Sequence, residues 1–195
     1  MMTNDLFKSL AKIESALHLL NRGVLVRSLQ QGLAPGAVQT KLKSIGLAST
    51  LELESLYGWR NGTESGGSAS LDDIHLFPGF HLLSLEDAIV NYQSFVTDDR
   101  WEYGWLPVFA NGGGDFYVVN GSLAGAGAVR HFRIEEAEHP IEFSSLSAML
   151  ATLAEGFDRG VFYVDRRGYL EMDDLVFDRL ASELNPDVNF WRELN

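Results

Sequence analysis

The order of two hydrophobic patterns along the chain most constrains its fold. The first sixty residues carry apolar residues at helical spacing, whereas the later part has short apolar runs bounded by Gly, Pro and Asn. Helical spacing gives a helix one apolar stripe, and short apolar runs between turn residues are typical of strands. Helices first, then strands interrupted by helices, predict an α+β fold: a twisted, mostly antiparallel sheet flanked by helices, with the N-terminal helices packed on it.

The clearest predicted helix begins the chain and ends near Gly23. Its apolar residues recur every three or four positions: Leu6, Leu10, Ile13, Leu17 and Leu20. This seven-residue period leaves two alternatives open, packing on the chain's own sheet or contact with a second copy. Further helices are expected over 38–45, after the caps Thr50 and Ser84, from Ser144 to Gly156, and over 175–184.

The predicted strands lie between turn signals in the middle and at the end of the chain. They cover 74–77, closed by Pro78-Gly79, then 116–119 and 129–134, and a hairpin joins 162–164 to 169–170. The polar stretch 61–68 is interpreted as a surface loop. Because the chain shows no internal repeat or linker, one domain over 1–195 is expected, with 1–30 as a helical N-terminal extension.

Charge is distributed unevenly along the chain. Fifteen basic and twenty-seven acidic residues give a net charge of −12. Residues 1–50 hold six basic and two acidic residues, and residues 51–195 hold nine and twenty-five, so the second part carries −16. Phosphate backbones repel such a surface, which argues against nucleic-acid binding. The acidity favours either solubility or electrostatic steering toward a basic protein partner.

The lack of cysteine and of long apolar runs limits the kinds of site and the cellular location that we expect. The chain has no cysteine, which excludes disulfides and thiolate metal sites. Charged residues interrupt its first twenty positions, and no run reaches the roughly 20 apolar residues that span a bilayer. We therefore expect no membrane association and a cytoplasmic location.

Motifs for catalysis are sparse. The run Gly112-Gly113-Gly114-Asp115 enters a strand rather than a helix, so it is interpreted as a tight turn, with Asp115 bonding local backbone amides, instead of a phosphate loop. The five histidines lack metal-ligand spacing, and neither a metal nor another cofactor is expected. One alternative stays open: a small-ligand or metal-dependent enzyme using acidic pairs with His131 or His139.

Several short motifs, in their order and spacing, resemble the SUKH superfamily of Smi/Knr-like domains over about residues 33–191. The motifs are Leu33-Ala34-Pro35-Gly36, Leu56-Tyr57 with Trp59 and Asn61-Gly62, Leu76-Phe77-Pro78-Gly79, Ser84-Leu85-Glu86-Asp87, Trp105-Leu106-Pro107-Val108-Phe109, Gly113-Gly114-Asp115, and Asn185-Pro186 with Trp191. Ser49-Thr50 departs from the family's usual Leu-Pro, although Thr50 can cap the following helix instead.

The resemblance implies a non-catalytic protein-binding module. Bacterial relatives are typically cytosolic immunity proteins that neutralise a cognate toxin, often a nuclease or deaminase, and others are regulatory adaptors. It assigns no catalytic residue, and it implies structural roles for Tyr57, Gly62, Trp105, Pro107, Gly113, Gly114 and Asp115. The candidate partner-binding residues, chosen near loop and turn signals, are Trp59, Asn61, Asp72, Asp73 and Trp101. A monomer or weak homodimer is expected.

Overall fold

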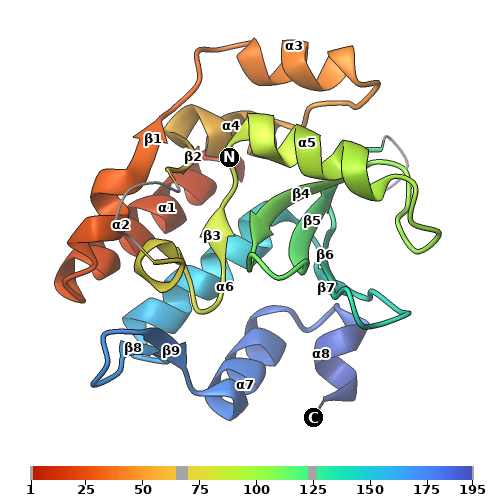
Figure 1. The fold of residues 1–195 in the computed structure, drawn as a ribbon. Coiled ribbons are helices and arrows are strands. Elements are labelled where there is room, and N and C mark those ends of the chain that lie inside the picture. The colour runs from red at the N-terminus through yellow and green to blue at the C-terminus, as the bar shows by residue number, and fades with distance from the viewer. Residues whose placement is uncertain (1, 65–69, 123–126, 195) are drawn as a thin grey trace.

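A five-stranded antiparallel sheet forms the centre of the protein (Figure 1). The computed structural model describes residues 2–64, 70–122 and 127–194. The sheet order follows the chain: β3 (His81–Leu82), β4 (Trp105–Ala110), β5 (Phe116–Asn120), β6 (Val129–Phe132) and β7 (Ile141–Phe143). Two small antiparallel sheets accompany it: β1 (Leu29–Gln31) with β2 (Arg60–Thr63), and β8 (Phe162–Val164) with β9 (Leu170–Met172). The predicted α+β class, with a mostly antiparallel sheet, is confirmed.

Helices flank the central sheet (Figure 1). They are α1 (Met2–Leu19), α2 (Gly23–Ser28), α3 (Ala37–Ser44), α4 (Leu51–Trp59), α5 (Leu85–Phe95), α6 (Leu146–Asp158), α7 (Asp174–Leu184) and α8 (Asn189–Glu193). As predicted, side chains of Thr50 and Ser84 cap α4 and α5. The cap of α6 is Ser145, one residue beyond the predicted Ser144. Within the described ranges, no helix is both long and apolar enough to cross a bilayer.

The stripe of α1 packs against α6 in the protein's own core. Leu6, Leu10, Ile13 and Leu17 are each at most 1% exposed. Leu20, the last residue of the predicted stripe, follows the helix and is partly buried. The packing leaves the four helical positions covered and therefore unavailable to a second copy. The helix also ends at Leu19, and Gly23, predicted as its end, instead begins α2.

Two predicted segments differ from the structure. Residues 74–77 are not a strand, because the 3-10 helix η1 (Asp72–Ile74) precedes a tight turn at Phe77–Phe80. Pro78 lacks an amide hydrogen and Gly79 has φ +79°, so ladder pairing begins only after the turn, at β3. Residues 60–63, expected in a loop, form the largely buried strand β2. Positions 65–69 of that expected loop lie outside the described residues.

The sheet has a register shift in β4, and a helix covers its last edge. Pro107 cannot donate a ladder hydrogen bond, and β4 accommodates it at a shift in register against β5. Strand β7 ends the sheet, and α8 lies against it. The Trp191 indole N–H donates to the backbone carbonyl of Glu142 on β7. Helix α8 thereby covers an edge that would otherwise offer unpaired backbone groups.

Candidate functional site

An open groove of about 940 Å³ lies between the β6–β7 loop, the segment before β4 and α8. Four exposed carboxylates from these segments line it, and we call it the acidic groove: Glu102, Glu138, Asp187 and Glu193. None of the four forms an ion pair with another described residue. Within the described chain, no ion pair therefore neutralises these four carboxylates.

Both arginines that line the groove are held by the protein itself. Arg100 donates to the Asp98 carboxylate at 2.8 and 3.0 Å and to two backbone carbonyls of the β6–β7 loop. The hydrogen bonds from Arg100 lower the pKa of Asp98 to about 2. Arg130 donates to the His139 carbonyl at 2.7 Å, and its guanidinium lies 5.3 Å from the centre of the Trp105 ring. Neither guanidinium pairs with the four groove carboxylates.

Apolar and aromatic residues complete the lining of the groove. Trp105 and His139 are 2% and 7% exposed, and Val188 is buried as well. Ile141, at 37% exposed, gives the groove an accessible apolar contact at the edge strand. A polar rim around an apolar centre is the usual arrangement of a protein-binding surface.

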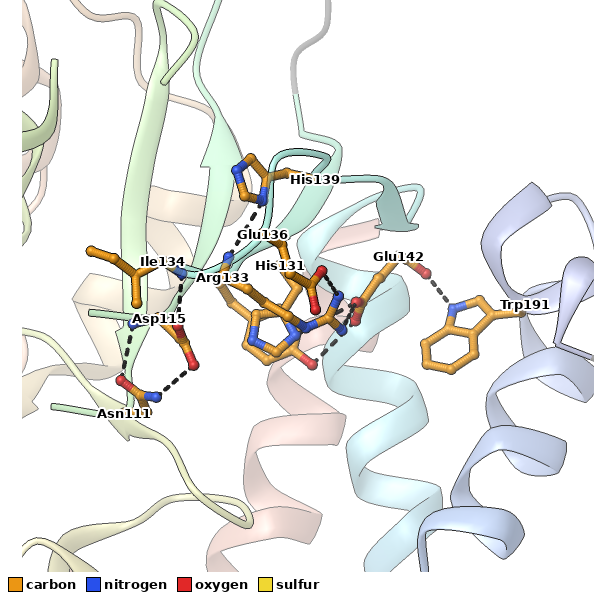
Figure 2. A network of polar contacts seen from close by, with 10 residues as sticks. Asn111, Asp115, His131, Arg133, Ile134, Glu136, His139, Glu142 and Trp191 are labelled. Atoms are coloured by element: carbon orange, nitrogen blue, oxygen red, sulfur yellow. Dashed lines mark hydrogen bonds and ion pairs between the residues drawn. The ribbon is translucent and has the colours of Figure 1, made fainter. Parts of the chain in front are cut away.

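A second polar cluster centres on the buried carboxylate of Glu142 on β7, which is 1% exposed (Figure 2). Its Oε1 accepts from Arg133 Nη2 at 2.9 Å, and its Oε2 accepts from the Tyr117 hydroxyl at 3.2 Å. Arg133 also pairs with Glu136 at 3.2 Å. A buried carboxylate is tolerated only when it is paired and hydrogen-bonded, and Arg133 with Tyr117 supplies both.

His131 stands beside this carboxylate without a hydrogen bond. Its Nδ1 lies 3.5 Å from Glu142 Oε1, and its ring stacks on Tyr117 with centroids 4.5 Å apart. Neither ring nitrogen has a hydrogen-bond partner among the described residues. Two buried ring nitrogens therefore retain unused hydrogen-bonding capacity next to a cavity.

That cavity, which we call the Glu142 cavity, has a volume of about 170 Å³. Its polar end is formed by Tyr117, His131, Arg133 and Glu142, and Asp178 of α7 adds a further carboxylate. Aromatic rings make much of the remaining wall: Phe77, Phe80, Phe143, Phe162, Phe177, Phe190 and Trp191. Large aromatic area with a few polar groups is typical of small-ligand pockets.

Two protonation equilibria are displaced in this cavity. Burial, followed by the nearby Glu142 carboxylate, raises the pKa of Tyr117 well above its usual range, so its hydroxyl stays a donor. Burial, followed by repulsion from Asp174 and Glu142, raises the pKa of Asp178. Asp178 is half-buried, and its side-chain carboxylate has no hydrogen bond or ion pair to another part of the described chain.

Two of the predicted partner-binding side chains are internal. Trp101 is 6% exposed, and its ring packs 4.8 Å from that of Phe132. Asn61 is 8% exposed, accepts from the Leu85 amide at 2.9 Å and donates to Glu86 at 3.0 Å. Burial removes both side chains from the protein's surface.

The other predicted partner-binding residues are more accessible. Trp59 is half-buried, and its indole donates to Glu14 at 3.2 Å. Asp72 has a 46% exposed side chain, and its backbone carbonyl accepts from Arg22. Hydrogen bonds from the backbone and hydroxyl of Ser70 lower the pKa of Asp73. None of these three residues lines the acidic groove.

The family-motif residues occupy structural positions. Tyr57 and Trp105 are core side chains at 0% and 2% exposed, and Pro107 lies within β4. Gly62 has φ +86°, and a Cβ there would lie 2.3 Å from the backbone nitrogen of Ser84. Side chains are therefore excluded at Gly62.

The glycine run forms a turn, as predicted, but with different hydrogen bonds. Asn111 Oδ1 accepts from the amides of Gly113 and Asp115, at 2.7 and 3.0 Å. Gly114 has φ +107°. The expected bonds from local amides to Asp115 are absent among the described residues. Its carboxylate accepts instead from Asn111 Nδ2 and, across the sheet, from the Ile134 amide at 2.9 Å.

The two histidines of the enzyme alternative are not brought to one site. His131 lines the Glu142 cavity, whereas His139 lines the acidic groove. Among the described histidines, aspartates and glutamates, no group of three lies close enough to share a metal ion.

Sequence reasoning missed most residues of both sites. Glu142 is one acidic residue among twenty-seven. Its only signal is its place between Ile141 and Phe143, an alternation too short to predict a strand. Groove residues Glu102, Glu138 and Glu193 are far apart in the chain, and only the fold brings them together.

Comparison with known proteins gives no assignment. No family model matches the chain, and no curated protein matches it.

Proposed function

We propose that the chain is a non-catalytic, cytosolic binding module that neutralises a basic toxin of the nuclease or deaminase type by direct protein contact. The observation that carries this proposal is the acidic groove. It joins four unpaired carboxylates with an accessible apolar residue at the sheet edge. The motif resemblance to Smi/Knr-like domains supports the same function.

The physical argument is charge complementarity. A basic loop or helix of a partner would exchange solvent contacts for the groove carboxylates, while apolar groups of that segment cover Ile141. Nucleases and deaminases that act on nucleic acids carry the required positive surface, because it binds the phosphate backbone. Arg100 is paired with Asp98, and Arg130 donates to a backbone carbonyl, so neither arginine forms an ion pair with the groove carboxylates that a basic partner would contact.

The test is rescue in cells. The protein encoded next to this chain is expressed alone, where toxicity is expected, and then with the wild-type chain, where growth is expected to recover. A groove variant carries Glu102→Gln, Glu138→Gln and Glu193→Gln. We expect it to bind the neighbouring protein at least about tenfold more weakly, a loss of about 1.4 kcal/mol.

A control variant removes the same charge elsewhere, with Glu64→Gln, Glu171→Gln and Asp174→Asn. These three side chains are exposed and form no ion pair within the described chain. The control is expected to bind as the wild type does. Absence of rescue by the wild type would contradict the proposed function, and equal losses in both variants would contradict the groove as its site.

A further inference from the structure

The Glu142 cavity has the size of a site for a small molecule, and this inference stands apart from the proposed protein partner. Its volume is about 170 Å³. An engineered apolar cavity of about 150 Å³ in another protein holds benzene. Phe80, Asp178 and Phe190 in its wall are only partly buried, so a ligand has access from solvent.

The wall of the cavity is aromatic on two sides. From the sheet side come Phe77 and Phe80, with Phe80 4.9 Å from Tyr117. From the helix side come Phe177 and Trp191, with ring centroids 6.0 Å apart. The faces of aromatic rings carry negative charge density and attract cations. A flat, positively charged molecule could contact the aromatic rings on both sides of the cavity.

The charges of the cavity leave one carboxylate unbalanced. The Glu142 carboxylate is paired with Arg133, which also pairs with Glu136. Asp178 has no such partner in the described chain, and its raised pKa reflects burial and two neighbouring carboxylates. An anionic ligand would meet Asp178 and Glu142, and a neutral apolar ligand would bury Asp178 without compensation. A cationic ligand would avoid both the repulsion that an anion meets and the uncompensated burial of Asp178 under a neutral ligand.

We propose that the Glu142 cavity binds a small organic ammonium ion with an aromatic body, its charge on Asp178 and its ring between the aromatic walls. The unpaired nitrogens of His131 give the ligand a further hydrogen-bond partner. The structure thus assigns a small-ligand site near, but distinct from, the acidic groove, with Phe190 lining both.

The test compares three ligands of similar shape at pH 7: benzylammonium, benzyl alcohol and benzoate. Affinity is measured by calorimetry, and the site by the indole NMR signal of Trp191. Benzylammonium is expected to bind about tenfold more tightly than benzyl alcohol, a difference of about 1.4 kcal/mol, and benzoate most weakly. Equal affinities, or tighter binding of benzoate, would overturn the proposal.

Two variants test whether the Asp178 carboxylate provides the preference for a cationic ligand. Asp178→Asn is expected to reduce the preference for benzylammonium over benzyl alcohol to less than about threefold. The control Glu171→Gln, which changes an exposed carboxylate that does not line the cavity, should keep the preference. A preference that survives in Asp178→Asn would also overturn the assignment.

A further binding measurement tests whether the ligand is a small aromatic amine or a lysine side chain of a protein. Nα-acetyl-lysine methylamide carries the same charge on a flexible apolar stem. Weaker binding than benzylammonium is expected, since the stem cannot contact both aromatic walls as a ring does. Tighter binding would overturn the aromatic ligand in favour of a lysine.

Discussion

Replacing Trp105 with alanine should lower the free energy of unfolding by about 3–5 kcal/mol. The ring is 2% exposed, and the rings of Trp101 and His139 lie with centroids 6.0 Å away. The Arg130 guanidinium lies 5.3 Å from the ring centre, so truncation also removes a cation–π contact. A whole domain is stable by only about 5–15 kcal/mol, so this single change removes a large share.

Thermal unfolding monitored by circular dichroism measures the loss. At about 2–4 °C per kcal/mol for a chain of this size, Trp105→Ala should unfold about 6–20 °C below the wild type. Trp105→Phe is the matched control: the Trp105 indole N–H has no hydrogen-bond partner among the described residues, so phenylalanine loses ring area without losing a hydrogen bond. Its decrease should be less than half that of alanine. An unchanged midpoint for Trp105→Ala would refute the packing of β4 given above.

Three other measurements test separate parts of the structure. Glu142→Gln should lower the free energy of unfolding in urea by about 3 kcal/mol, because it leaves Arg133, whose side chain is only 28% exposed, with a weaker partner. A neutral effect would contradict the ion pair. Gly62→Ala should cost at least about 2 kcal/mol, since φ is +86° and the new Cβ meets backbone; wild-type stability would contradict this contact. Burial lowers the pKa values of His75 and His81, so below about pH 6.5 the unfolded state takes up protons that the folded state resists, and stability should fall from pH 7 to pH 5. The double change to glutamine should flatten that slope, and an identical slope would exclude these histidines as its source.

Local patterns predicted much of the fold. The stripe of α1, the caps Thr50 and Ser84 and the 162–170 hairpin follow from spacing and turn chemistry, which act within a few residues. The strand β2 was missed because Asn61-Gly62 is typical of turns. In the structure Gly62 allows close approach of the backbone near Ser84, a tertiary contact that overrides the local preference.

The sites depended on contacts that sequence spacing does not contain. Glu102, Glu138 and Asp187 reach one groove only because the sheet, the β6–β7 loop and α8 converge. Trp101 lies near turn signals, as interface tryptophans often do, but the packing of Phe132 against its ring buries it. Burial is a property of the whole fold, so a tryptophan near a turn does not by itself mark a binding surface.

The dependence of association on salt tests the central claim, that the acidic groove recognises a basic protein. The screening length falls from about 30 Å at 0.01 M salt to about 10 Å at 0.1 M. Over this range, the association rate constant with the neighbouring gene's product should decrease about tenfold or more for the wild type and for the control variant. For the groove variant, with Glu102, Glu138 and Glu193 neutralised, the decrease should be much smaller. A rate constant that stays flat with salt in the wild type, or equal slopes in the two variants, would contradict the account.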